Sequence, residues 1–221
     1  MKIDVKGAVV QDSDAWIYEW LGMSFCSPSN VQRALAEADG GTVDVEINSG
    51  GGDIFAASEI YTALRNYRGE LRIHVTGMAG SAASVIACAG KSDISPTAMV
   101  MVHNVSSGGA DGDYHVKDKE SEILRKANEA IAAAYTEKTG MSREDALAMM
   151  DRETWMTAAD AVKAGLIDEI AQPPGIQLSA AAGGLLPPET IRRIRNTVKS
   201  PAARRAQAEI DILRLKGEQT Q

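Results

Sequence analysis

Ser81 is the residue whose surroundings most strongly suggest chemistry, and it lies in segment 77–84 (GMAGSAAS). An apolar run at 71–76 precedes this segment and small residues continue to Gly90, so the pattern predicts a strand, a tight turn and a helix. A serine at such a turn holds its hydroxyl at a helix N-terminus, where free backbone N–H groups favour negative charge. An isolated serine at a helix start is usually a cap, so its interpretation as a nucleophile depends on its partners.

A serine hydroxyl needs a general base to take its proton, so a histidine should accompany Ser81. Among the three histidines of the chain, His103 ends the apolar segment 98–102. We expect it at the same sheet edge as the serine. His74 falls in the middle of the preceding strand, where a position on the pleat or in the core explains it. His115 begins a polar segment and is expected to be solvated.

Three consecutive glycines, at positions 50–52, follow an alternating apolar segment at 42–47. Glycines between a strand and a helix let backbone N–H groups approach a substrate closely, and two such donors stabilise a tetrahedral oxyanion. A simple turn is one alternative. A phosphate-binding loop is another, but no Lys-Ser/Thr pair follows and no G-x-G-x-x-G is present.

The third member of a serine–histidine pair should be a carboxylate that orients the imidazole. Three acids in segment 150–160 (MDRETWMTAAD) are available, namely Asp151, Glu153 and Asp160. Each is equally well explained as a surface charge. The residue types alone do not choose among them.

Strand-like and helix-like segments alternate along the chain. Strands are predicted over 3–10, 42–47, 71–76, 98–103 and 166–171, and helices over 30–38, 53–67, 81–90, from about 114 to 138, 142–150 and 157–164. This alternation predicts an α/β fold with largely parallel strands. The glycines at 50–52 and Ser81 both follow strand C-termini, the edge where open α/β sheets bind ligands.

Composition narrows the classes of function. The chain has 221 residues and a formal net charge of −7, which does not favour nucleic-acid binding. The two cysteines fit no metal or redox spacing, and no apolar run approaches membrane-spanning length, so we expect no metal, no membrane segment and a cytoplasmic location. Residues 172–221 hold eight Lys and Arg against four Asp and Glu. They are predicted to form a basic linker and helical C-terminal tail beyond a domain at 1–171.

Five segments, in order, resemble the Clp protease proteolytic subunit: 47–52 (INSGGG), 77–83 (GMAGSAA), 101–104 (MVHN), 155–158 (WMTA) and 165–168 (GLID). Within that family the short chain is similar to the head-maturation proteases encoded by phages and prophages. The resemblance implies a ClpP/crotonase-like spiral of β-β-α units with a protruding handle at about 106–138. It also implies a homo-oligomer, a heptamer or a tetradecamer of stacked rings.

The resemblance implies Ser81 as the nucleophile and His103 as the base. The aspartate of the family lies two positions before an aromatic residue, and here that position is Glu153, before Trp155. A glutamate can accept from the imidazole, although its extra methylene shifts the geometry. Asp151 is the fallback for this third position.

The remaining expected site residues bind substrate through their backbone. The oxyanion donors implied by the resemblance are the N–H groups of Gly51, Gly52 and Ala82. Gly108 and Gly109 of the handle are expected to bind a polypeptide substrate by strand addition.

Two features of the sequence depart from the family pattern, one in the glycine loop and one at the N-terminus. Gly50 replaces the proline of the family's Ser-Pro-Gly-Gly, which gives a looser loop. The chain begins almost directly in its first strand, so little sequence is left for the axial loop that meets an ATPase, and an unfoldase partner is doubtful. The tail is expected to bind a capsid or scaffold protein, or to be removed by self-cleavage.

The sequence therefore predicts a self-compartmentalising serine endopeptidase with a Ser-His-Asp/Glu triad and no cofactor, acting in phage capsid maturation. Two alternatives stay open. One is a crotonase-type acyl-CoA enzyme, which uses paired backbone N–H groups without a Ser–His pair. The other is a catalytically silent ring that serves as a scaffold or adaptor.

Overall fold

The computed structural model describes residues 1–109 and 111–172. Its strands are β1 (Lys2–Val9), β2 (Phe25–Cys26), β3 (Val43–Gly52), β4 (Leu71–Gly80), β5 (Lys91–Ile94), β6 (Met99–Val102), β7 (Thr154–Thr157) and β8 (Glu169–Ile170). Its helices are α1 (Asp12–Trp20), α2 (Pro28–Ala38), α3 (Ile54–Arg65), α4 (Ala82–Ala87), α5 (Tyr114–Thr139), α6 (Arg143–Asp151) and α7 (Ala158–Lys163). Met1–Pro173 forms one compact unit.

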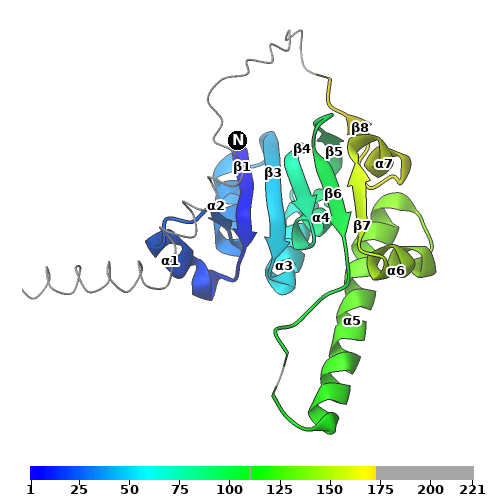
Figure 1. Ribbon diagram of the computed structural model, residues 1–221. Helices are drawn as coiled ribbons and strands as arrows, with labels where there is room; N and C mark the ends of the chain where they lie inside the picture. Colours follow the sequence, from blue (N-terminus) through cyan, green and yellow to red (C-terminus); the bar gives the residue numbers. More distant parts are fainter. Residues whose placement is uncertain (110, 173–221) are drawn as a thin grey trace, which may run out of the picture. The chain divides into compact units, whose positions relative to one another are not determined.

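These strands form one sheet in the order β2-β1-β3-β4-β5-β8, and β6 and β7 extend it from the end of β4. The pairing is parallel except between β6 and β7, which run antiparallel. Helices α2, α3 and α4 lie against one face of β1, β3 and β4 (Figure 1). The predicted α/β fold with largely parallel strands is confirmed.

Strand β4 has two successive partners along one edge. Its first half pairs with β5, from Arg72↔Lys91 to Val75↔Ile94. Its second half pairs with β6, from Met78↔Met99 to Gly80↔Met101. The partner of β4 therefore changes from β5 to β6 along its length, which places the end of β6 beside the end of β4.

The core lies between this sheet and its helices. Ile47, Ile73 and Ile94 on the strands are fully buried, and all six residues of α4 (AASVIA) are buried as well. A helix enclosed on every side must carry small side chains where neighbouring elements approach closely. The alanines of α4 meet this need and place the short helix at the centre of the unit.

Helix α5 extends past the edge of the sheet (Figure 1), as the expected handle does. Its buried residues, Ile131, Ala132, Ala134 and Tyr135, all lie in its C-terminal third. The N-terminal two thirds contact the core little, although Asp113 caps the first turn by accepting from the N–H groups of His115 and Val116. His115 is exposed, as expected.

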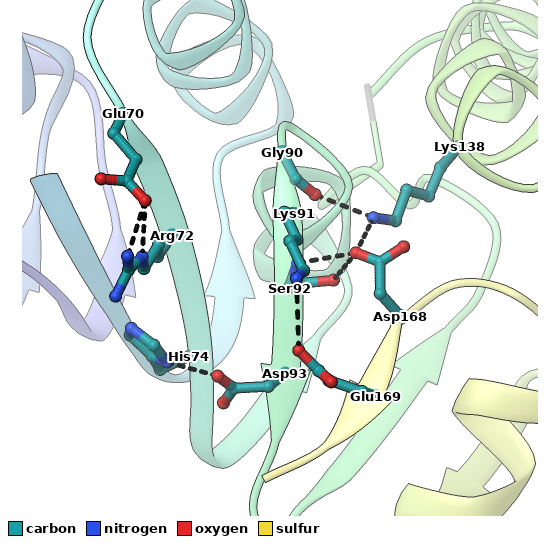
Figure 2. A network of polar contacts seen from close by, with 10 residues as sticks. All are labelled: Glu70, Arg72, His74, Gly90, Lys91, Ser92, Asp93, Lys138, Asp168 and Glu169. Atoms are coloured by element: carbon teal, nitrogen blue, oxygen red, sulfur yellow. Dashed lines mark hydrogen bonds and ion pairs between the residues drawn. The ribbon is translucent and has the colours of Figure 1, made fainter. Parts of the chain in front are cut away.

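A polar network lies on the first half of β4 and on β5 and β8, which pair with one another (Figure 2). His74, half-buried in β4, places Nδ1 2.7 Å from Asp93 Oδ2 on β5. At the end of α5, Lys138 donates to Asp168 Oδ2 at 2.5 Å and to the carbonyl of Gly90 at 2.8 Å. His74 therefore has a structural role in joining β4 to β5, and Lys138 fastens the base of α5 to the sheet.

Two further predictions concern membrane-spanning segments and the C-terminal tail. The described residues contain no helix that is long and apolar enough to cross a membrane. The predicted basic tail lies outside them apart from Gln172, so the boundary between a domain at 1–171 and a tail at 172–221 stays a prediction.

Candidate active site

Ser81 occupies the single position between the end of β4 and the start of α4. Its φ of 52° and ψ of −125° lie outside the regions that non-glycine residues ordinarily adopt, so the backbone is strained there. The strained turn is held on both sides. The N–H of Ser81 donates to the carbonyl of Met101 at 2.8 Å, and its carbonyl accepts from the N–H of Ser84 at 2.9 Å.

His103 follows β6 and reaches the serine directly. Its Nε2 lies 2.7 Å from Ser81 Oγ, a hydrogen-bond distance that allows proton transfer between the two. The pairing of Gly80 with Met101 in the ladder between β4 and β6 explains the contact, because it aligns the two strand ends. The structure thus brings together the two residues that the sequence analysis chose as nucleophile and base.

The carboxylates do not complete a triad in this structure. Val102 pairs with Thr154 at the end of the ladder between β6 and β7, so His103 and Glu153 are the next positions across from each other. The side chain of Glu153, however, accepts from Trp155 Nε1 at 3.1 Å. Within the described residues, His103 has no hydrogen bond to a carboxylate. Glu153 also has a positive φ of 47°, which gives the turn before β7 a left-handed residue.

The two other acids have partners of their own. Asp151 Oδ1 accepts from Asn104 Nδ2 at 2.7 Å, one residue beyond the histidine. Asp160 Oδ2 accepts from the N–H and the hydroxyl of Thr157 and completes a capping box at the start of α7. Asp160 is therefore a structural residue, and Asp151 lies close to the site without contacting the imidazole.

The backbone donors expected for an oxyanion divide into two groups. Ala82 is the first residue of α4, where a helix N–H has no acceptor inside the helix. Gly52 is the last residue of β3, and the next N–H, that of Asp53, donates to the carbonyl of Val9 on β1 at 2.8 Å. Ala82 adjoins Ser81 and Gly52 lines the pocket beside it, and their role as oxyanion donors stays a prediction.

Gly51 differs from the expectation, because its N–H already donates to Ser49 Oγ at 3.0 Å. Its contribution is steric instead. A Cβ at Gly51 would lie 2.7 Å from both the carbonyl oxygen of Gly80 and Cβ of Ser81, and its φ of 98° also favours glycine. Gly51 therefore allows the strand β3 to approach the serine turn closely.

A pocket of about 310 Å³ opens beside Ser81 and His103. One wall comes from the start of α3, one from α5 and one from the loop after His103. The apolar lining consists of Ile54, Phe55, Val105, Ile123, Leu124, Ala127, Ile131 and Tyr135. Such a lining suits an apolar side chain next to the bond that Ser81 would attack.

The glycines expected to bind substrate lie farther out. Gly108 and Gly109 are exposed in the loop that leads from the pocket toward α5, and Gly109 has a φ of 79°. The N–H of Gly109 donates to Ser107 Oγ at 3.3 Å. The loop has no strand structure here, so its binding of a peptide stays a prediction.

Sequence reasoning missed several residues of this site. Asn104 lines the pocket, and its buried Oδ1 has no partner in the part of the chain that the structure describes. Ser49 holds the glycine turn by donating to the carbonyl of Gly7 at 2.6 Å. Asn104 lies in the MVHN segment beside His103, and Ser49 lies in the INSGGG segment before the glycines, but no local pattern indicates the contacts that either residue makes.

A family model described as Clp protease matches residues 32–174, the range that contains Ser81, His103 and Glu153. The chain belongs to the Clp protease family. The match leaves only the first strand, α1, β2 and the start of α2 before it, so it covers the site just described.

Curated proteins similar to this Clp family member include two bacterial subunits. The chain is 35% identical over 137 residues to the ATP-dependent Clp protease proteolytic subunit of Bacteroides fragilis, an alignment that covers 59% of this chain and 64% of the relative. It is 37% identical over 133 residues to the ATP-dependent Clp protease proteolytic subunit 1 of Chlamydia trachomatis, covering 56% of this chain and 67% of the relative. The chain thus matches less than two thirds of the first relative's length.

A solved structure supports the fold of this Clp family member independently. A ClpP1 mutant from Listeria monocytogenes superposes with a TM-score of 0.64 at 20% sequence identity, covering 78% of this chain and 91% of the other. The expected ClpP/crotonase-like fold is therefore confirmed.

Proposed function

We propose that this Clp family member is a serine endopeptidase in which Ser81 is the nucleophile and His103 the general base. The observation that carries the proposal is the contact of 2.7 Å between Ser81 Oγ and His103 Nε2. Membership of the family and the similarity to subunits named as proteolytic support it. The apolar pocket beside the pair supports a substrate with an apolar side chain at the cleaved bond.

The reaction follows from this geometry. Ser81 Oγ attacks the peptide carbonyl carbon while His103 Nε2 takes its proton, and the new oxyanion accepts hydrogen bonds from the N–H groups of Ala82 and Gly52. His103 then gives the proton to the leaving amine, which leaves an ester on Ser81. Water then attacks this ester while His103 Nε2 takes a proton from the water. The same nitrogen gives that proton to Ser81 Oγ as the bond between Oγ and the acyl carbon breaks, which releases the acid product and restores the serine.

The third member is proposed to be Glu153, with Asp151 as the fallback. Its place across from His103 in the strand register supports Glu153. Its carboxylate would have to leave Trp155 Nε1 and turn toward His103 Nδ1, which a change of side-chain rotamer could achieve. A carboxylate there would fix the tautomer that exposes a basic Nε2 to the serine.

The substrate is proposed to be a polypeptide that pairs with the loop around Gly108 and Gly109. Backbone pairing would hold the chain extended across Ser81, and the apolar pocket would select one side chain. This chemistry uses no nucleotide, so we expect short peptides to be cleaved without an ATPase, even though the relatives are named as ATP-dependent.

We further propose that the chain forms a heptamer or a tetradecamer, and that its substrates are capsid or scaffold proteins of a phage or prophage. The family assignment supports ring assembly, and the exposed side chains of Val116 and Ile123 on α5 give the handle an apolar surface for a second copy. Capsid maturation and a cytoplasmic location are supported only by the resemblance to the short phage-encoded members and by the composition.

The decisive experiment is intact mass spectrometry of the assembly before and after a fluorophosphonate probe, on the wild-type chain and on Ser81→Ala. We expect one probe adduct per wild-type subunit at Ser81, peptide cleavage that disappears in the variant, and the same subunit number in both. Cleavage retained by Ser81→Ala would contradict the proposal. Binding of a CoA thioester unaffected by Ser81→Ala would favour the crotonase-type alternative, and intact rings without any adduct would favour the silent ring.

A further inference from the structure

A buried chain of hydroxyl groups links helix α5 to the serine turn. Tyr135 on α5 and Ser84 on α4 are each only 1% exposed. Ser84 Oγ lies 2.6 Å from the carbonyl oxygen of Ser81 and 2.8 Å from the phenol oxygen of Tyr135. The two residues are 51 positions apart in the sequence, and neither belongs to the serine–histidine pair.

The direction of these hydrogen bonds follows from the number of protons. A carbonyl oxygen has no proton, so the hydroxyl of Ser84 must donate to Ser81. Its only proton is then used, and Ser84 Oγ accepts from the phenol of Tyr135. A phenol is protonated at neutral pH and can donate, and burial raises the pKa of Tyr135 further.

The anchored carbonyl shares a peptide group with the proposed oxyanion donor. The carbonyl of Ser81 and the N–H of Ala82 belong to one planar, trans unit, so fixing one end fixes the direction of the other. The carbonyl receives both the N–H of Ser84, at 2.9 Å, and its hydroxyl, at 2.6 Å. This double contact holds a turn whose φ of 52° at Ser81 would otherwise relax.

We propose that Ser84 and Tyr135 are positioning residues that aim the N–H of Ala82 at the reacting carbonyl oxygen by holding the Ser81–Ala82 peptide group. The inference rests on the proposed peptidase function and adds to it two residues that do not touch the substrate's reacting atoms. The ring of Tyr135 also lines the pocket, so the same residue connects the handle helix with both parts of the site.

The test compares Tyr135→Phe, which removes one oxygen, with Ser84→Ala and with the double variant. An oxyanion contact forms only in the transition state, so kcat for peptide cleavage should fall about tenfold in each variant while KM stays within about twofold. The rate constant for labelling of Ser81 by a fluorophosphonate should fall in parallel. Because Tyr135 acts through Ser84, the double variant should be no slower than Ser84→Ala alone.

Two controls separate positioning from general stability. Tyr67→Phe removes a phenol that donates to the carbonyl of Gly41 at 2.6 Å before the N-terminal ends of β3 and β4, whereas Ser81 follows the C-terminal end of β4, so it should leave kcat unchanged. The midpoint of the pH profile of kcat/KM should be the same in all variants, because the imidazole of His103 is not altered. Ser84→Ala keeps a good helix former and stays informative if Tyr135→Phe fails to fold.

The outcomes distinguish this inference from the function on which it rests. Labelling of wild-type Ser81 with rates unchanged in Tyr135→Phe and Ser84→Ala would overturn the positioning role alone. Additive losses in the double variant would overturn the route through Ser84. A wild-type chain that the probe does not label at Ser81 would overturn the peptidase function and this inference together.

Discussion

His103 Nε2 lies 2.7 Å from Ser81 Oγ, whereas the described residues place no carboxylate on the other nitrogen of the same ring. The nucleophile and the base are therefore in hydrogen-bond contact although no acid contacts the imidazole. The two acids proposed for that role contact other residues here, Glu153 contacting Trp155 and Asp151 contacting Asn104.

The first prediction decides between these two acids. Glu153→Gln should lower kcat about 100-fold, because an amide cannot stabilise the imidazolium that forms when Ser81 attacks. Asp151→Asn should keep kcat within about threefold, since it removes only a contact with Asn104. Steady-state cleavage of one fluorogenic peptide measures both, and the opposite ranking would assign the role to Asp151.

The second prediction concerns the close approach of β3 to the serine turn. Gly51→Ala should reduce kcat at least about 100-fold and lower the stability by about 1–3 kcal/mol, because its Cβ would collide with Gly80 and Ser81. Gly50→Ala is the matched control, because nothing lies within 4 Å of a Cβ there. Peptide cleavage and thermal unfolding of the two variants give the comparison. Equal cleavage rates and unfolding temperatures of the two variants would contradict the prediction, because they would show that the structure relieves the collision at no cost.

The third prediction concerns the base of α5. Partial burial raises the pKa of Asp168, but the hydrogen bonds from Lys138 and Ser92 lower it more, so the pKa lies below its ordinary value. A carboxyl with a lowered folded pKa stabilises the fold above its unfolded pKa, and this stabilisation is lost as pH falls through the folded pKa. Asp168→Asn should therefore cost about 1–2 kcal/mol at pH 7 and much less at pH 2.

Thermal unfolding between pH 2 and pH 7 measures this difference between Asp168→Asn and the wild type. Glu169→Gln is the control, because its contact with Lys91 is long, at 3.6 Å, and both side chains are exposed. A constant difference across the pH range for Asp168→Asn would contradict a role for its ionised form.

The fourth prediction is that the two thiols are inert in the folded chain. Burial raises the pKa of Cys26 and of Cys88 to about 12. At pH 8 the thiolate fraction is then about one in ten thousand, so a thiol reagent should react at least about 100-fold more slowly with the folded than with the unfolded protein. Thiol titration before and after addition of guanidinium measures this ratio. Rapid reaction of the folded chain would mean that one thiol is accessible.

The sequence predicted the elements whose hydrophobic pattern is strong and missed those without one. Helix α2 and the cap of α3 at Asp53, which accepts from the N–H of Ala56, were predicted because their apolar spacing and capping residue are local signals. Helix α1 was missed because none of its residues is buried, so no apolar stripe marks it. Strands β3 and β4 were predicted too short, since their last residues are glycine-rich and have low β-propensity, yet pair with β1 and β6.

The candidate site divides in the same way. Ser81 and His103 were found because each follows an apolar strand, and parallel strands bring their C-terminal ends to one edge. The occupied amide of Gly51 and the contact of Glu153 with Trp155 depend on side-chain rotamers that no local pattern encodes. The pairing of Ser84 with Tyr135 joins distant segments and becomes visible only when α4 and α5 are packed together.

Helix α5 is held to the rest of the unit mainly at its C-terminal end. Its 26 residues give it a length of about 39 Å, and its anchoring contacts through Tyr135 and Lys138 lie in the last two turns. A force on the first turn near Tyr114 would therefore displace that end of the helix more than the anchored C-terminal end. Between the two ends, Ile123, Leu124 and Ala127 line the pocket beside Ser81, so movement of the tip would change the shape of that pocket before it reached the serine turn.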